Sequence, residues 1–568
     1  MTAPENFELE SETLGALPIV AHFFERVGLA GHLDRHLPNN DARLRVAPAT
    51  VIGVVVANLV VGRRPLYALG EWAAPYSPAL LGLDAGDAAA LNDDRVGRTL
   101  DRLFDADRAS FITGVVLGVI RDFDLDCSQL HNDSTTVTFS GDYRAATGAS
   151  RGGKPTPAIT YGHNKDHRPD IGQLLWVLTV TADGAVPIAY RTQDGNTPDD
   201  ITHIATWDEL VALVGRPDFL YVADSKLANR AAMDHIAHRG GRFVTILPRT
   251  RKEDREFRDH IYEHEPDWTE AHRRPARTAG RPDEVFHTTP ARQPSSEGYR
   301  IIWIRSSSKI DRDAEARRAR IAKGIAALDD LNRRLASTRT RIRSTAAAET
   351  AAAAALETAG AARWIGFEIT ETTTETLRQE KPGRPGAKTR YRKIVRTHHH
   401  VTFQINEHLV ARDAASDGCF PLITNDTTLT AAEVLAAYRY QPNLERRNHM
   451  LKGPQQVAPV YLKTAHRIEA LLLCQFLALL TEALIERHIR NAMTTADLHD
   501  IPLYPELRAC PAPSAHRILE IFDGVTRHHL TQQGQPIQTF EPELTPLQHQ
   551  ILDLLDIPTH TYTNQKTP

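Results

Sequence analysis

The sequence predicts an α/β protein in which an all-helical region precedes an α/β core, and a β/helical insertion interrupts that core. Apolar residues recur at helical spacing up to about residue 122, and short β-branched runs alternate with helical segments from residue 125 onward. Basic and alanine-rich stretches break this alternation between residues 249 and 400. Strands that alternate with helices are typical of α/β domains, and 568 residues suffice for several domains.

Residues 1–124 are expected to form a helical N-terminal domain. Ile19, Phe23 and Val27 lie on one helical stripe, and prolines such as Pro38 and Pro65 separate the helical segments.

Residues 125–248 are expected to form the first part of the α/β core. A strand-like run covers 130–139, and runs at 173–181 and 186–192 flank a turn containing Asp183 and Gly184, which predicts a hairpin. A helix is expected at 199–214, an apolar strand at 219–223 that ends at Asp224, a helix at 227–238 and a strand at 243–247.

Residues 249–400 are interpreted as an insertion, with a strand at 299–304 and helix-prone sequence at 311–358. Its alanine-rich end, 346–362, suits a helical arm; we favour packing on its own domain, and dimerisation through it stays open.

The core resumes at 401–495, with strand-like runs at 401–405, 408–411 and 420–423. Thr430 and Glu433 form a capping box, Pro442 restarts the helix that contains Glu445, and a long helix covers 463–493. Residues 496–568 are left as a C-terminal tail region.

Composition favours a cytoplasmic protein without a membrane segment. Only four cysteines occur, without a Cys-x-x-Cys pair, which argues against a disulfide framework or a structural zinc site. The N-terminus shows no signal-peptide pattern. The most apolar segment, 468–485, contains Glu469 and Glu482 and is interpreted as a buried helix.

The net charge of −4 does not by itself indicate nucleic acid. Local basic runs at 242–281 and 381–396 are able to neutralise phosphates. Solvated basic loops explain them equally well.

Three carboxylates are the candidate catalytic residues. Asp133 lies inside the run His131–Val137, where a central strand would have an apolar residue; an edge-strand or turn aspartate is the alternative. Asp224 follows an apolar run, where α/β sheets place ligand-binding groups, although aspartate also caps helices there. Glu445 stands on a helix beside Arg446, where a solvated surface residue is common.

Together, the three carboxylates match an oxygen-ligand site for Mg²⁺ or Mn²⁺. Two such ions, roughly 3.5 to 4 Å apart, can activate an attacking oxygen and stabilise the leaving oxygen of an in-line phosphoryl displacement. This chemistry is that of nucleases and strand transfer.

The chain resembles bacterial insertion-sequence transposases of the Asp-Asp-Glu type, which have a ribonuclease H-like catalytic core and a Tyr-Arg-Glu-Lys signature. The resemblance rests on five segments: His131-Asn-Asp-Ser-Thr-Thr136, Tyr161-Gly-His-Asn-Lys-Asp-His-Arg-Pro-Asp170, Gly195-Asn-Thr-Pro-Asp199, Val222-Ala-Asp-Ser-Lys226, and Tyr438-Arg-Tyr-Gln-Pro-Asn-Leu-Glu-Arg-Arg-Asn-His-Met-Leu-Lys452. It implies a ribonuclease H-like core with Asp133 on the first strand, Asp224 after the fourth and Glu445 on a helix after the insertion.

The signature implies that Tyr438 and Lys452 hold DNA phosphate beside the metal-binding Glu445. Gln441 stands where the signature has arginine, so a charged clamp is replaced by a neutral group unless Arg439, Arg446 or Arg447 substitutes. Because Pro442 bends the segment, Tyr438 and Glu445 are expected on different helices.

The resemblance implies cut-and-paste transposition of double-stranded DNA, with a homodimer holding two element ends in the bacterial cytoplasm and two Mg²⁺ or Mn²⁺ ions as cofactors. It also implies that the helical domain of residues 1–124 contributes to binding the DNA ends. Two alternatives stay open: a metal-dependent nuclease without strand transfer, and a catalytically inactive, transposase-derived DNA-binding protein.

For two further features, we favour a structural role over a functional one. Consecutive strand residues point to alternate faces, so His398, His399 and His400 do not readily meet one ion. Trp364 is able to stack on an unpaired base, yet a core tryptophan is commoner.

Overall fold

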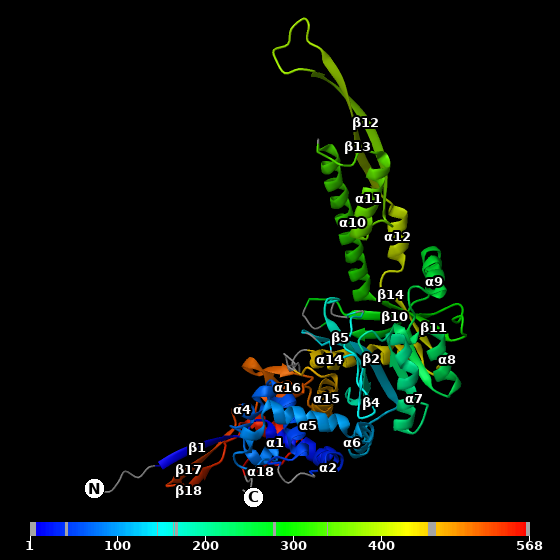
Figure 1. Ribbon diagram of the computed structural model, residues 1–568. Helices are drawn as coiled ribbons and strands as arrows, with labels where there is room; N and C mark the ends of the chain where they lie inside the picture. Colours follow the sequence, from blue (N-terminus) through cyan, green and yellow to red (C-terminus); the bar gives the residue numbers. More distant parts are fainter. Residues whose placement is uncertain are drawn as a thin grey trace. The chain divides into compact units, whose positions relative to one another are not determined.

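The structure, a computed structural model, describes residues 7–563 except 40–43, 142, 145, 163, 165–167, 277–279, 338 and 453–461. The chain forms two compact units. The first unit combines Met1–Thr245 with Ala436–Pro568, and the second unit is Ile246–Leu435. Figure 1 shows the course of the chain, from the blue N-terminal helices to the red C-terminal segments.

The N-terminal part of the first unit is helical apart from its first strand. Side chains cap two of its helices: Asn92 accepts a hydrogen bond from the Arg95 amide, and Asp107 accepts one from the Ser110 amide. The helices are α1 (Leu17–Val27), α2 (Leu29–His36), α3 (Pro48–Ala57), α4 (Leu69–Ala73), α5 (Asp93–Asp105) and α6 (Arg108–Asp122).

The C-terminal segment, expected only as a tail region, is folded and meets the N-terminus. Strand β17 (Thr526–Gln532) pairs with β1 (Phe7–Thr13) on one side and with β18 (Gln535–Phe540) on the other. Pairing between strands more than 500 residues apart has no local sequence signal. The remaining elements here are β15 (Ile501–Tyr504), β16 (Arg508–Cys510), α16 (Ala515–Glu520), α17 (Pro546–Leu554) and α18 (His560–Thr563).

Five strands of the first unit run in the order β6-β5-β2-β7-β8. Strand β2 pairs antiparallel with β5 and parallel with β7; β5 and β6 are antiparallel, and β7 and β8 are parallel. The strands are β2 (Gln129–Phe139), β5 (Gly172–Thr181), β6 (Pro187–Asp194), β7 (Leu220–Ala223) and β8 (Arg242–Ile246), with helices α7 (Thr202–Val214) and α8 (Arg230–His238) between them. Short strands β3 (Ser150–Arg151) and β4 (Lys154–Pro155) form a separate pair.

Helices α13 (Ala431–Arg439), α14 (Gln441–Lys452) and α15 (Ala465–Thr495) follow the insertion. The capping box is present, because Thr430 Oγ1 accepts from the Glu433 amide and a Glu433 carboxylate oxygen accepts from the Thr430 amide. Helix α15 is long and apolar enough to cross a membrane, but its apolar window is 94% buried. The bent pair Pro48–Gly62 and Leu66–Ala73 passes the same length and composition test, with a bend of 104°.

The second unit contains β14 (Cys419–Thr424), β11 (Arg300–Ser306), β10 (Glu284–Pro290) and β9 (Thr269–Arg274), paired in this order and all antiparallel. Helix α9 (Lys252–Glu263) lies within the run that the sequence presented as a basic loop. Residues 408–411, expected as strand, belong instead to α12 (Glu407–Ala415), because the Asn406 side chain caps that helix at the Leu409 amide.

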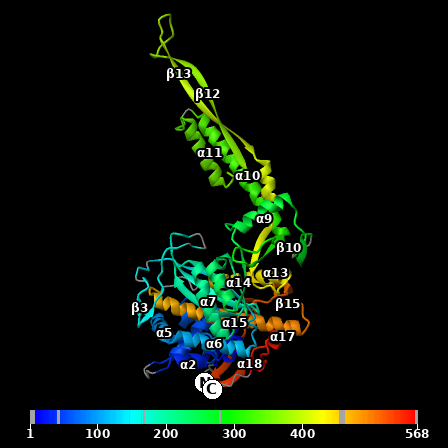
Figure 2. The same cartoon turned by 90° about the vertical axis from the view of Figure 1, so that its right-hand side faces the viewer.

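The second unit also contains a long two-stranded ribbon. Strands β12 (Ile365–Gln379) and β13 (Tyr391–Ile405) pair antiparallel along their whole length. One end packs on α10 (Ser307–Ala336) and α11 (Thr345–Ala359) through a core that includes Leu328, Ala352 and Val401. The alanine-rich helix thus packs on its own domain, as favoured from the sequence (Figure 2).

Candidate functional site

Asp133 lies on a central strand of the first unit. Strand β2 has β5 on one side and β7 on the other, so the edge-strand alternative does not apply. The side chain is half-buried, and its Oδ2 accepts a hydrogen bond from the side-chain Nδ2 of Asn448 at 3.1 Å. Because Asn448 belongs to α14, this contact joins the strand with Asp133 to the helix with Glu445.

The strand register brings Asp224 beside Asp133. Asn132 on β2 pairs with Ala223 on the parallel strand β7. Asp133 directly follows Asn132, and Asp224 directly follows Ala223. Asp224 is half-buried, and its Oδ1 accepts from the Lys226 amide at 3.0 Å, so it also caps the short 3-10 turn that follows. The capping role and a site role are compatible, because a carboxylate has two oxygens.

Glu445 lies on an exposed face of α14, while the opposite face of this helix is buried. The buried residues of α14 are Gln441, Leu444, Arg447, Asn448 and Leu451. Tyr438 lies on α13, so it and Glu445 occupy different helices, as Pro442 led us to expect.

Gln441 faces inward and connects α14 to β2. Its Oε1 accepts from His131 Nδ1 at 2.9 Å, and its Nε2 donates to the Asn132 carbonyl at 3.1 Å. Burial lowers the pKa of His131 to about 4, against the opposing effect of Gln441, so the imidazole is neutral at pH 7. With its side chain 5% exposed, Gln441 has a structural contact at the position where the signature has its phosphate-binding arginine.

Arg447 attaches α14 to the β5–β6 turn and to α15. Its guanidinium donates to the Ala185 and Gly184 carbonyls in the β5–β6 turn, at 3.1 and 3.2 Å, and pairs with Glu486 of α15 at 2.9 Å. Both charged side chains are almost completely buried. Arg447 therefore does not replace the missing signature arginine, whereas Arg446, which is exposed, faces solvent.

Tyr438 is half-buried, and the charges of all three predicted carboxylates act on its phenol. Burial, followed by the negative charges of Asp224, Glu445 and Asp133 in that order, raises the pKa of its phenol to about 12. Only charges close to a group perturb its pKa in this way. The phenol therefore stays protonated at neutral pH among the three predicted site residues.

The donor chemistry of this site suits a hard divalent cation, because carboxylate oxygens are the ligands that Mg²⁺ prefers. Within the described part of the chain, however, no three His, Cys, Asp or Glu side chains stand close enough to hold one ion together. The three carboxylates are neighbours of Tyr438 without forming a closed ligand set.

Other predicted residues have clear positions. Arg439 ends α13 and Lys452 is the last residue of α14, and both side chains are partly exposed. His163 and His167 of the 161–170 segment lie outside the described residues.

The histidine run and Trp364 have structural positions. His398 and His400 lie on one ribbon face and the buried His399 on the other. Trp364 is 8% exposed and donates to Asp413 at 2.8 Å, which is a core position.

Sequence reasoning missed Asn448, His131 and Glu486. Asn448 is three residues after Glu445, about one helical turn, and this spacing of an amide side chain from the candidate carboxylate was the available signal. The pairing of Arg447 with Glu486 had no signal in the sequence.

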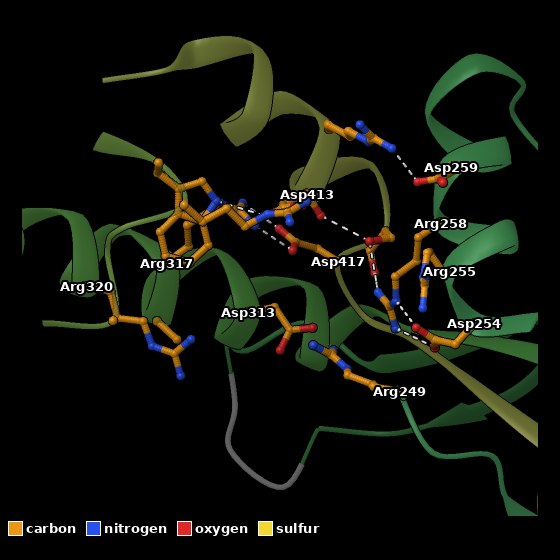
Figure 3. Close-up of a pocket in the computed structure, with 16 residues that line it drawn as sticks. Arg249, Asp254, Arg255, Arg258, Asp259, Asp313, Arg317, Arg320, Asp413 and Asp417 are labelled. Atoms are coloured by element: carbon orange, nitrogen blue, oxygen red, sulfur yellow. Dashed lines mark hydrogen bonds and ion pairs between the residues drawn. The ribbon is translucent and has the colours of Figure 1, made fainter. Parts of the chain in front are cut away.

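The second unit contains a cavity of about 600 Å³ that is lined by charged side chains (Figure 3). Its carboxylates are engaged with cations, for example Asp417 with Arg317 at 2.7 Å, Asp254 with Arg258 at 2.7 Å and Asp313 with Lys309 at 2.8 Å. Paired in this way, they are poor candidates for a metal site.

Comparisons with known proteins extend this description only slightly. Residues 9–117 match a family described as a domain of unknown function, DUF4277. No curated protein matches the chain. A solved structure, the piggyBac transposase synaptic complex with hairpin DNA, is similar with a TM-score of 0.27 and 10% identity, over 50% of this chain and 60% of that chain. That likeness is too weak to establish a common fold, so we infer function from the site residues.

Proposed function

We propose that the chain is a DNA transposase of the Asp-Asp-Glu type, which cleaves DNA at the ends of an insertion sequence and joins the freed ends to a target by cut-and-paste transposition. The observation that supports this proposal most directly is that Asp133 and Asp224 stand at adjacent positions of paired strands, while the helix with Glu445 is bonded to Asp133 through Asn448. Separated by up to about 300 residues in the sequence, these are the three carboxylates that the transposase resemblance singles out.

A ribonuclease H-like core is part of the proposal, and the strand arrangement of the first unit supports it. Counting β2 as the first strand, β5 and β6 add antiparallel on one side, and β7 adds parallel on the other. Asp133 then lies on the first strand and Asp224 directly follows the fourth, as the resemblance implies.

Each site residue has a proposed role. Asp133, Asp224 and Glu445 would hold two divalent cations, Mg²⁺ or Mn²⁺, which activate an attacking oxygen and stabilise a leaving oxygen. Tyr438, neutral at physiological pH, donates a hydrogen bond to a DNA phosphate. The cations Lys452, Arg439 and Arg446 stand at the ends and exposed face of the same helices, where they are able to contact the DNA backbone.

We further propose a homodimer that holds two element ends in the bacterial cytoplasm. A nuclease without strand transfer would use the same carboxylates, so a joining assay with a free 3′-hydroxyl end distinguishes the two. An inactive derivative would bind DNA without breaking it.

The test is cleavage and joining of DNA that contains the ends of the chain's own element, with Mg²⁺ or Mn²⁺. We expect Asp133→Asn, Asp224→Asn and Glu445→Gln each to abolish both reactions while DNA binding survives. Glu256→Gln is the matched control, because Glu256 is an exposed acid in an i,i+4 pair with Lys252 on α9. It should cleave like the wild type.

Cation binding gives an independent readout. Titration with Mn²⁺, followed by electron paramagnetic resonance, should show two bound ions for the wild type and weaker binding for each variant. Wild-type DNA binding without strand breakage would refute catalysis and favour the inactive derivative. Cleavage without joining would favour the nuclease.

A further inference from the structure

The ribbon of the second unit continues past the helices that support it. The last contacts with helices are the Thr345 hydroxyl donating to Glu371 at 3.0 Å, and Asn332 bonding both the amide and the carbonyl of Val401. We name residues 372–398 the distal ribbon. Nearly all its residues are exposed, and Figures 1 and 2 both show this part of β12 and β13 running beyond α10 and α11.

The distal ribbon is strongly basic. Residues 378–396 contain eight lysines or arginines and one acid, Glu380. The cations are Arg378, Lys381, Arg384, Lys388, Arg390, Arg392, Lys393 and Arg396. A net charge of +7 within 19 residues contrasts with −4 for the whole chain.

The strand register separates the charges between the two faces. Thr374 pairs with Arg396, and Arg378 with Arg392, on the face turned away from the helices, which we name the outer face. From Thr370 to Arg378 and from Arg392 to His400, this face has threonines, histidines, arginines and Ile394, and no acid.

Between residues 370 and 378 the two acids, Glu371 and Glu375, lie on the helix-side face and are already engaged, and the one acid of the strands on the outer face, Glu368, lies outside the distal ribbon. Glu375 pairs with Lys393 at 2.6 Å, and Glu371 accepts from Thr345. The exposed apolar side chains Leu377 and Val395 are on this same face. The outer face is therefore left, at its distal end, with cations, hydroxyls and the one apolar side chain of Ile394.

We propose that the outer face of the distal ribbon is a docking surface for duplex DNA, with Arg378, Arg392 and Arg396 on backbone phosphates. This deepens the proposed function, on which it rests for the identity of the partner. The major groove of DNA, about 12 Å wide, admits a two-stranded ribbon. Eight residues, 372–379, extend roughly 26 Å, which matches about eight base pairs at about 3.4 Å each.

Charge complementarity selects DNA over a second copy of the chain. Two copies of a surface with the same excess positive charge repel, whereas DNA presents one negative charge per roughly 1.7 Å of its axis.

The test measures binding of a 40-base-pair duplex of arbitrary sequence by fluorescence anisotropy over a range of salt concentrations, in EDTA. The variant combines Arg378→Gln, Arg392→Gln and Arg396→Gln in the full chain. If all three arginines contact phosphate, the slope of log affinity against log salt should fall by roughly 3, and affinity at about 0.15 M salt by tenfold or more.

The matched control combines Arg312→Gln, Arg318→Gln and Lys323→Gln on exposed positions of α10, which removes the same charge from the same unit. It should bind nearly as the wild type does. Equal losses in both variants would overturn the proposal in favour of bulk charge, and so would a wild type that does not bind DNA. A ribbon variant with wild-type affinity but altered oligomeric mass would assign the face to a second copy.

EDTA prevents metal-dependent cleavage, so this assay measures DNA binding without catalysis. The proposed function and the docking of DNA on the distal ribbon can therefore be refuted independently. A chain that binds through the ribbon but never cuts DNA in Mg²⁺ refutes the proposed function alone. A chain that cuts DNA while the ribbon variant binds normally refutes this inference alone.

Discussion

Gln441→Ala should destabilise the first unit, because the Gln441 amide is a structural link between α14 and β2. The substitution leaves the buried His131 Nδ1–H without its acceptor, which costs about 1–3 kcal/mol, and removes the bond to the Asn132 carbonyl, worth about 0.5–1.5 kcal/mol. The expected loss of unfolding free energy is therefore about 2–4 kcal/mol. Gln441→Arg, which restores the signature residue, loses the same acceptor and also places a cation at a buried position.

Urea unfolding measures the stability, and hydrogen exchange of the β2 and α14 amides locates the change. Arg446→Ala is the control on the same helix; since Arg446 is exposed, its effect should stay within about 0.5 kcal/mol. Unchanged stability in Gln441→Ala, together with tighter DNA binding by Gln441→Arg, would refute the reasoning and show that residue 441 faces DNA.

Three further outcomes follow from buried or perturbed groups. Arg447→Met should lower the unfolding free energy by up to about 3–5 kcal/mol, because it leaves the buried Glu486 with only the more exposed Arg490 as an ionic partner. In urea titrations, adding Glu486→Gln should recover part of the loss, and strict additivity of the two substitutions would contradict the pairing. Burial raises the pKa of Glu482 to about 7, so the folded chain keeps a proton that the unfolded chain releases near pH 4.5, and stability should fall as pH rises from 4.5 to 7. The difference in unfolding free energy between pH 5 and pH 8 should shrink in Glu482→Gln by up to on the order of 3 kcal/mol. A pH dependence of stability equal to that of the wild type would exclude Glu482 as its source. Tyr438→Phe should slow DNA cleavage by roughly 10- to 100-fold with the pH profile between 7 and 9 unchanged, because the phenol is protonated throughout; a change of profile would mean that Tyr438 ionises.

Local patterns predicted the elements that lie around the site. The β5–β6 hairpin follows from β-branched runs around Gly184, and the apolar run before Asp224 forms β7. The capping box at Thr430 starts α13 as expected. In each case the signal and the structure lie within about ten residues of each other, so the sequence suffices.

Features that depend on distant partners were not predictable. Strand β12 was missed because its threonine and glutamate residues lack an apolar alternation outside the part that packs on α10 and α11. The pairing of β1 with β17 and the contact of Gln441 with His131 join residues about 500 and 310 positions apart. The signature identified Gln441 as a departure, but only the structure shows what the glutamine contacts.

Asn448 illustrates why the anchors of α14 matter for a cluster of like charges. Carboxylates held near one another raise each other's free energy, so neutral donors must hold the helix with Glu445 beside β2. Asn448 provides such a donor to Asp133. Asn448→Asp replaces the donor with a fourth carboxylate, which raises the folded pKa of the new pair above its unfolded value. Its stability should therefore be near that of Asn448→Ala at pH 4, where the pair is protonated, and fall below it as pH rises to 7. Unfolding curves of the two variants that stay parallel from pH 4 to 7 would show that Asp133 and residue 448 do not interact, and α14 would then be held by Gln441 and Arg447 alone.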